Sequence, residues 1–169
     1  MENSAKFYSL SFTNSRTWLF AGLFVIGNIL FPQLCHLLPV GGPTLLPIYF
    51  FTLIAGYKFG LKVGLLTAIC SPLINHILFG MPPSAALPAI LIKSLVLAGI
   101  SAIVALRIQK VSFPAILVIV LTYQIVGTAF EWIISGSLYA AAQDFRIGIP
   151  GMLIQWIGGY ALLKLLAKA

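Results

Sequence analysis

The chain has 169 residues, of which 60% are hydrophobic and only 8% are charged, and its formal net charge at pH 7 is +7. A water-soluble domain of this size would have too little polar surface to cover itself, so the composition excludes a soluble globular protein and indicates a membrane protein. The basic residues are spread along the chain and not gathered on one face, so the positive charge implies no nucleic-acid partner.

The sequence predicts an all-α, polytopic fold in which residues 1–169 form one domain of six transmembrane helices. A mostly polar segment, 1–16, comes first, and we expect it to remain uncleaved, with Asn14 or Ser15 capping the first helix. Most of the apolar segments that follow approach the ~20 residues that a helix needs to cross ~30 Å of hydrocarbon. The predicted spans are 17–38, 45–57, 63–80, 85–106, 113–135 and 147–163.

The second predicted span, 45–57, is shorter than the others. At ~1.5 Å per residue it would cover only about 20 Å. The preceding segment PVGGPT therefore either ends at the membrane surface or dips into the protein, where irregular backbone must be buried or must line a wet cavity. We expect Gly41 and Gly42 to let the backbone turn tightly there, through positive φ or through close approach to a neighbour.

The basic residues predict the orientation, because Lys and Arg in short loops mark the cytoplasmic side. If both termini are cytoplasmic, eight of the ten basic residues lie at cytoplasmic ends of spans, and Arg146 is the basic residue of the outer loops. The eight are Lys6, Arg16, Lys58, Lys62, Arg107, Lys110, Lys164 and Lys168. The expected location is therefore a bacterial cytoplasmic (inner) membrane, with both termini inside.

Polar residues within the spans recur three and four residues apart, which places them on one face of each helix. Helix packing alone accounts for many of these, because small and hydroxyl side chains let membrane helices approach closely. With the predicted orientation, however, most fall in the outer half of the membrane, which is typical of a cavity open to the outside. The candidate ligand-binding residues are Lys93, Glu131, Asn75, His36, Gln155, Asn28 and Trp132.

Lys93 lies in the middle of an apolar run, LPAILIKSLVLAGI, and a charge in a span costs ~2.5–3.5 kcal/mol on insertion scales. Glu131 is the acidic residue found within the predicted spans, and the two depths differ by roughly 6 Å, which a lysine stem can cross. Two interpretations stay open. Lys93 and Glu131 form a structural ion pair, or Lys93 binds a ligand carboxylate or phosphate while Glu131 orients it or accepts a ligand donor.

The sequence contains no nucleotide-binding loop, no HExxH and no nucleophile elbow, so we expect no enzyme and no bound cofactor. An intramembrane acid–base enzyme built on Lys93, Glu131 and His36 is a weaker possibility, because no spacing demands it. Cys35 and Cys70 have no metal-binding spacing. Adjacent Cys35 and His36 could ligate cobalt or another borderline metal if the helix has ended there, but the packing of a small apolar thiol is the simpler interpretation.

The segment LLPIYFFTLIAGYKFGLKVGLLTAICSPLINHILFGMPP, residues 45–83, resembles the second and third helices of S components, the substrate-binding subunits of energy-coupling factor (ECF) vitamin transporters. The size and the six predicted spans match as well. The resemblance implies capture of a vitamin or related micronutrient in a pocket in the outer half of the bundle, capped by the loops after the first, third and fifth spans. It also implies a coupling subunit and two ATPase subunits as partners, which alone use ATP.

Two alternatives remain. Some solitary S components carry cobalamin, and small membrane proteins also serve as scaffold subunits of envelope complexes, in which intramembrane charges bind a partner helix. A scaffold would place polar residues on a lipid-facing stripe, whereas a solute pocket places them inside. Trp132 could stack on a flat ligand ring or anchor its helix at the membrane interface.

Overall fold

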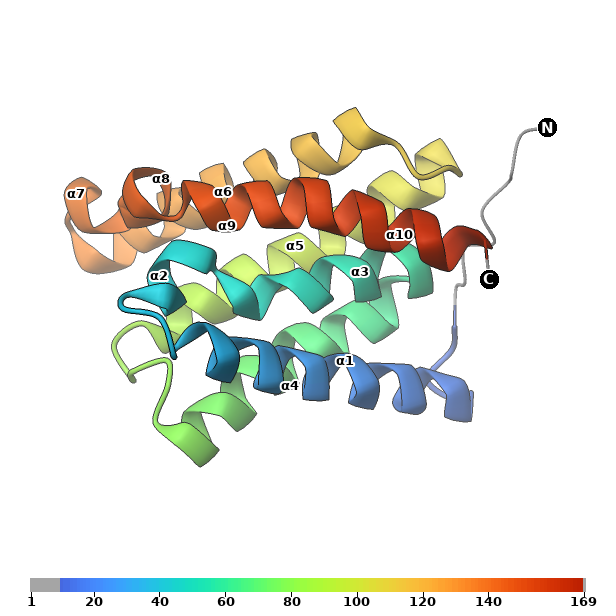
Figure 1. Cartoon of the computed structure of the whole chain (residues 1–169), viewed down its shortest axis with the longest axis horizontal. Coiled ribbons are helices and arrows are strands. Elements are labelled where there is room, and N and C mark those ends of the chain that lie inside the picture. The colour runs from blue at the N-terminus through green and yellow to red at the C-terminus, as the bar shows by residue number, and fades with distance from the viewer. Residues whose placement is uncertain (1–9, 169) are drawn as a thin grey trace.

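The computed structural model describes residues 10–168, which form helices with no β-strand among them (Figure 1). The predicted all-α fold is confirmed. The long helices are α1 (Ser15–Cys35), α4 (Leu61–Phe79), α5 (Leu87–Ile108) and α6 (Phe113–Ser135). The short ones are α2 (Gly41–Leu45), η1 (Pro47–Tyr49), α3 (Phe50–Phe59), α7 (Leu138–Ala141) and α8 (Gln143–Ile147). The last helical segment joins α9 (Ile149–Leu153), the π-helical η2 (Ile154–Gly158) and α10 (Gly159–Lys168).

Five helices of the described chain are long and apolar enough to cross a membrane, which makes this a multi-pass membrane protein. They are Ser15–Cys35, Leu61–Phe79, Leu87–Ile108, Phe113–Ser135 and Ile149–Ala167. The second predicted span forms the short helical segment of η1 and α3 and does not reach that length. The prediction of six spans is therefore confirmed for five. The first helix begins where expected, because the Asn14 side chain accepts a hydrogen bond from Arg16 N and caps it.

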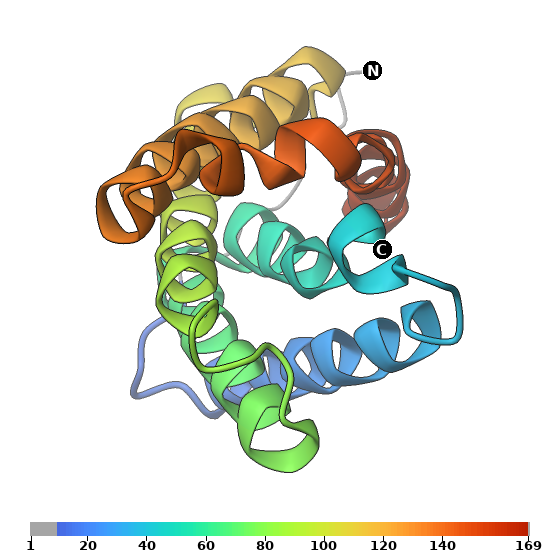
Figure 2. The same ribbon diagram turned by 90° about the vertical axis from the view of Figure 1, so that its left-hand side faces the viewer.

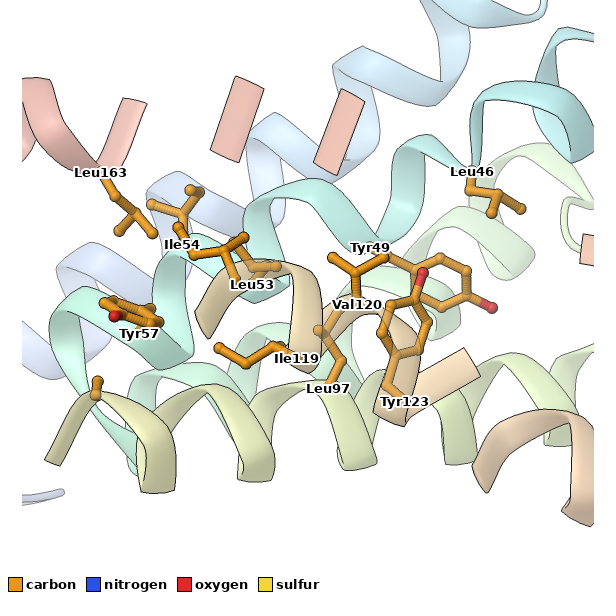
Figure 3. Close-up of a cluster of buried hydrophobic side chains, with 12 residues drawn as sticks. Leu46, Tyr49, Leu53, Ile54, Tyr57, Leu97, Ile119, Val120, Tyr123 and Leu163 are labelled. Carbon is orange, nitrogen blue, oxygen red and sulfur yellow. The ribbon is translucent and has the colours of Figure 1, made fainter. Parts of the chain in front are cut away.

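The short helix α3 lies at the centre of the bundle, with the long helices arranged around it (Figure 2). Its side chains from Thr52 to Phe59 are all buried. Leu53 and Ile54 belong to the apolar core and pack among Leu97 and Leu163 (Figure 3). A helix too short to cross the membrane thus becomes the core of the domain.

The two ends of the bundle differ in charge. Helix α1 begins and α10 ends at the same end (Figure 1), which we call the basic end. The basic end carries Arg16, Lys58, Lys62, Arg107, Lys110 and Lys164, whereas Lys6 lies outside the described residues. The opposite end is formed by α2, by the connection 80–86 between α4 and α5, and by α7 and α8, which carries Arg146. The described basic residues therefore separate as the sequence predicts.

Helices α3, α4 and α5 pack closely enough to require glycine. A Cβ on Gly56 would stand 2.8 Å from the Ala98 backbone oxygen, whereas a Cβ on Gly99, on α5, would meet nothing within 4 Å. We expect Gly56→Ala to lower the free energy of unfolding by about 1–3 kcal/mol, because the backbone must move apart. Gly99→Ala should be neutral or slightly stabilising, because alanine is the better helix former. Unfolding in mixed micelles measures both, and equal effects would contradict the packing argument.

Candidate functional site

A cavity of about 530 Å³ lies at the end of the bundle opposite the basic end. Three connections line it, together with the ends of the helices that they join: α2, the segment 80–86, and α8. Its lining residues are Pro32, Gln33, His36, Gly42, Pro43, Leu46, Pro47, Ile48, Tyr49, Asn75, Met81, Pro82, Pro83, Ala86, Ala89, Ile90, Lys93, Glu131, Gln143 and Asp144. Four of the seven candidate ligand-binding residues, Lys93, Glu131, Asn75 and His36, are therefore brought together around one space.

Lys93 forms ion pairs with two carboxylates at the wall of this cavity. Its Nζ donates to Glu131 Oε2 at 2.6 Å and to Asp144 Oδ2 at 2.9 Å. Lys93 is only 3% exposed and Asp144 7%, whereas the Glu131 side chain keeps 26% of its surface accessible. The predicted ion pair between Lys93 and Glu131 is thus present. Asp144 adds a second carboxylate, from the segment between the predicted spans 113–135 and 147–163, which was expected to form an outer loop.

Small residues make room for this arrangement. A Cβ on Gly127 of α6 would stand 2.2 Å from Lys93 Cγ, so the lysine stem crosses α6 where that helix has no side chain. Gly136, with φ +68°, ends α6, and the Ser137 side chain caps α7. The chain then turns back, so that α8 brings Asp144 to the Lys93 ammonium.

His36 and Asn75 add neutral polar groups to the cavity lining. His36 Nδ1 faces the Pro32 carbonyl oxygen at 2.7 Å, which assigns the proton to Nδ1 and leaves Nε2 as an acceptor in the neutral ring. Asn75 Nδ2 donates to the Asn28 and Ser71 carbonyl oxygens, both at 2.9 Å. Asn75 Oδ1 is buried and has no hydrogen-bond partner among the described residues.

Asn28 and Gln155 do not line the cavity. Their side chains form hydrogen bonds with the segment that leads into α3 and with the start of α3. Asn28 Oδ1 accepts from Phe51 N at 3.2 Å, and its Nδ2 donates to the hydroxyls of Thr52 and Ser71. Gln155 Nε2 donates to the Leu46 carbonyl oxygen at 3.4 Å. The Phe50 N–H donates to the Pro47 carbonyl oxygen, and the next N–H of α3, that of Phe51, has its acceptor in the Asn28 side chain.

Trp132 and Cys35 also lie away from the cavity. Trp132, on α6, is 49% exposed and belongs to the outer surface of the bundle, so its position favours anchoring over ligand stacking. Cys35 is buried at the end of α1 and does not line the cavity. Among residues 10–168, no three His, Cys, Asp or Glu side chains gather as a metal-binding group, so Cys35 and His36 have no further ligand beside them.

The glycines of α2 act through close approach and not through positive φ. A Cβ on Gly41 would stand 1.9 Å from the Cys35 carbonyl oxygen, and one on Gly42 would stand 2.8 Å from His36 Nε2. The left-handed conformation falls instead on the residues that flank α2, Val40 with φ 57° and Leu46 with φ 47°. Gly41 is buried, so the segment that precedes the short helix dips into the protein.

Comparisons with protein-family models, with characterised proteins and with solved structures find no match to this chain.

The ion pairs predict a strong effect of removing the lysine. Lys93→Met leaves two carboxylates without their cation, and we expect it to cost about 3–5 kcal/mol of stability, as loss of one partner from a buried ion pair does. Adding Glu131→Gln and Asp144→Asn should restore most of that loss, because the remaining groups are neutral. Unfolding in mixed micelles tests both variants. A single variant as stable as the parent chain would show that the ammonium does not hold these segments together.

Proposed function

We propose that this protein is a substrate-capture subunit for uptake of a vitamin or related micronutrient. The observation that carries the proposal is the cavity of about 530 Å³, which has charged residues in one wall and is lined by three connections at a single end of the bundle. A cavity of this volume lies within the range of small-molecule sites, which are mostly apolar with a few placed polar groups. Here the apolar part comes from prolines and aliphatic side chains, and the polar part from Lys93, Glu131, Asp144, His36 and Asn75.

The distribution of polarity favours a solute site over a scaffold that binds a partner helix. Lys93, Asn75, Ser94, Gln124 and Gln155 are all buried within the bundle. The outward face of α1, in contrast, is apolar and consists of Leu19, Leu23, Ile26, Leu30 and Leu34. A scaffold that recognised its partner through intramembrane charges would need such charges on a lipid-facing stripe. These exposed residues instead suit lipid tails.

The orientation that we propose places the cavity on the outer face of a bacterial cytoplasmic membrane. The basic end then faces the cytoplasm, together with both termini, as the positive-inside rule requires. In this orientation the cavity meets solutes before they cross the membrane. Helix α3 completes a six-helix arrangement without itself having to cross the full bilayer.

Transport itself would need energy from elsewhere, because the sequence contains no nucleotide-binding motif. The resemblance of residues 45–83 to S components supports an ECF coupling subunit and two ATPases as the partners that supply it. The chain would capture the ligand, and ATP hydrolysis by the partners would drive its release inside. A solitary cobalamin carrier is less favoured, because Cys35 does not line the cavity.

A ligand carried through purification would test the capture function. We expect a small molecule to remain with the chain purified in mild detergent from its own membranes and to be detected by mass spectrometry. Ala86→Trp should abolish its retention, because Ala86 lines the cavity and an indole there occupies ligand space. Ala85→Trp is the matched control, because the neighbouring Ala85 is exposed and does not line the cavity. Equal retention by both variants would contradict a ligand site in this cavity.

The orientation can be tested with single cysteines at the two ends. Ser84 and Lys110 are both exposed, Ser84 in the connection between α4 and α5 and Lys110 at the basic end. In intact cells we expect Ser84→Cys to react with a membrane-impermeant maleimide and Lys110→Cys to react only after lysis. The parent chain, with Cys35 and Cys70, sets the background. The reverse pattern would place the cavity on the cytoplasmic side and remove the case for capture from outside.

A further inference from the structure

We propose that the ligand of this cavity is an organic cation, such as a protonated amine or a cationic heterocycle, and that the carboxylates of Glu131 and Asp144 bind it. The inference rests on the proposed capture function and specifies the chemical class of its substrate. It differs from the expectation drawn from the sequence, in which the Lys93 ammonium receives an anionic ligand group.

The charge of the cavity wall supports a cation. Among the lining residues, one ammonium faces two carboxylates, so this ion-pair cluster carries one net negative charge. This charge lies at the cavity wall beside the buried residues Lys93 and Asp144, so it acts on a ligand that enters more strongly than the same charge would in bulk water. An anionic ligand would add a third negative charge beside two carboxylates, whereas a cation neutralises the excess.

Lys93 is already bound by two carboxylates in this arrangement. Its Nζ is held at 2.6 Å and 2.9 Å by carboxylates from α6 and α8, and the residue is 3% exposed. Two of the three Nζ hydrogens are used in this way, so a ligand carboxylate could accept only the third, and it would then lie beside two like charges. Lys93 is therefore a positioning residue that holds Glu131 and Asp144 close together at the cavity wall.

The carboxylates retain acceptor capacity. Among the described residues, the hydrogen bonds of Glu131 use Oε2 and those of Asp144 use Oδ2, so Oε1 and Oδ1 each accept none. An ionised carboxylate can accept about four hydrogen bonds in all. Glu131 has the more accessible side chain of the two and lies on the rigid helix α6, so it is the better placed to meet a ligand.

The neutral polar groups of the lining also include hydrogen-bond acceptors without a donor in the described part of the chain. Asn75 is 2% exposed, lines the cavity, and has an Oδ1 without a partner among residues 10–168. His36 offers the acceptor Nε2, since its Nδ1 proton is directed to Pro32 O. Buried acceptors without donors are costly, and a ligand rich in N–H groups would satisfy them. Asn75 is thus an observation independent of the acidic pair, and it points to a ligand that carries hydrogen-bond donors.

The rest of the lining indicates an organic cation and not a metal ion. The described residues contain no group of three His, Cys, Asp or Glu that could hold a metal. The lining also contains apolar side chains, among them Leu46, Ile48 and Ile90. A ligand with a hydrophobic or flat body and a cationic head would bury its body against these side chains and place its charge at Glu131.

The experiment uses the full chain in detergent and a library of vitamin-sized heterocycles sorted by charge. The library includes one matched series, tryptamine, tryptophol and indole-3-acetate, which share a ring and carry a cationic, a neutral and an anionic head. We expect compounds that raise the thermal unfolding midpoint to be cations, and tryptamine to bind at least tenfold more tightly than either partner in its series. Preference for anions, no charge preference, or no stabilising compound at millimolar concentration would overturn the proposal.

Two variants connect the preference to the carboxylates. Glu131→Gln keeps the shape of the side chain and the pair between Lys93 and Asp144, and it should reduce the preference for tryptamine over indole-3-acetate at least tenfold. Adding Asp144→Asn leaves Lys93 as the only charge and should reverse the preference toward the anion. Ser84→Leu, which changes an exposed residue outside the cavity lining, should keep it. An unchanged preference in Glu131→Gln, with the unfolding midpoint retained, would refute the assignment.

Failure of this proposal differs from failure of the capture function. If anions bind and Ala86→Trp abolishes their binding, the cavity captures solutes and only the charge assignment is wrong. If cations bind Ala86→Trp and the parent chain equally, the cavity is not the site, and both proposals fall.

Discussion

The Lys93 ammonium between two carboxylates is the interaction on which the cavity end of this protein depends. It joins α5, α6 and α8 at one point. Through Asp144 it connects the five-residue helix α8, which lies between α6 and α9, to the long helix α5. Each ion alone would be costly in an apolar bundle, but three together satisfy one another through short, charge-assisted hydrogen bonds. The excess carboxylate is what distinguishes this cluster from a closed structural pair, because a neutral pair would attract no charged ligand.

A second constraint is that backbone inside a membrane protein must find its hydrogen bonds within the protein. Between Cys35 and Phe50 the chain passes through the short helices α2 and η1, and side chains from other helices bind the buried part of this segment. Asn28 serves the start of α3, and Gln155 serves the Leu46 carbonyl group. Gln155 itself is held by Tyr123, whose hydroxyl donates to Oε1 at 2.7 Å. These polar residues hold the irregular segment that forms one wall of the cavity.

Much of the fold could be predicted from the sequence, because in a membrane protein the length and hydropathy of a segment nearly determine its helix. The predicted span 113–135 matches α6 at both ends, and the weakness of 45–57 as a span was visible in its length alone. The role of Asn28 and Gln155 was not visible. A polar side chain on an inward face looks the same whether it meets a ligand or a backbone carbonyl group, and only the path of the chain between α1 and α3 decides which.

Asp144 could not be predicted as a residue of the site from the sequence. Depth along two helices was enough to bring Lys93 and Glu131 together, because both lie within spans of known rise. Asp144 lies in the connection between α6 and α9, whose path depends on Gly136, Ser137 and Gly148 and has no period to follow. One signal was available: the chain has only three acidic residues, so a buried lysine had few possible partners.

Asp144, the third residue of the ion-pair cluster, changes the chemistry of the site more than it changes the geometry. With Glu131 alone, Lys93 would form a neutral pair, and a ligand anion could compete for the ammonium at the cost of one partner. With Asp144 also present, an anion must compete with two carboxylates and then remain beside both. The position of one loop carboxylate therefore converts a lysine that would favour anions into the support of a site that favours cations. The sign of the ligand's charge follows from the fold of the connection, and not from the conspicuous lysine in the helix.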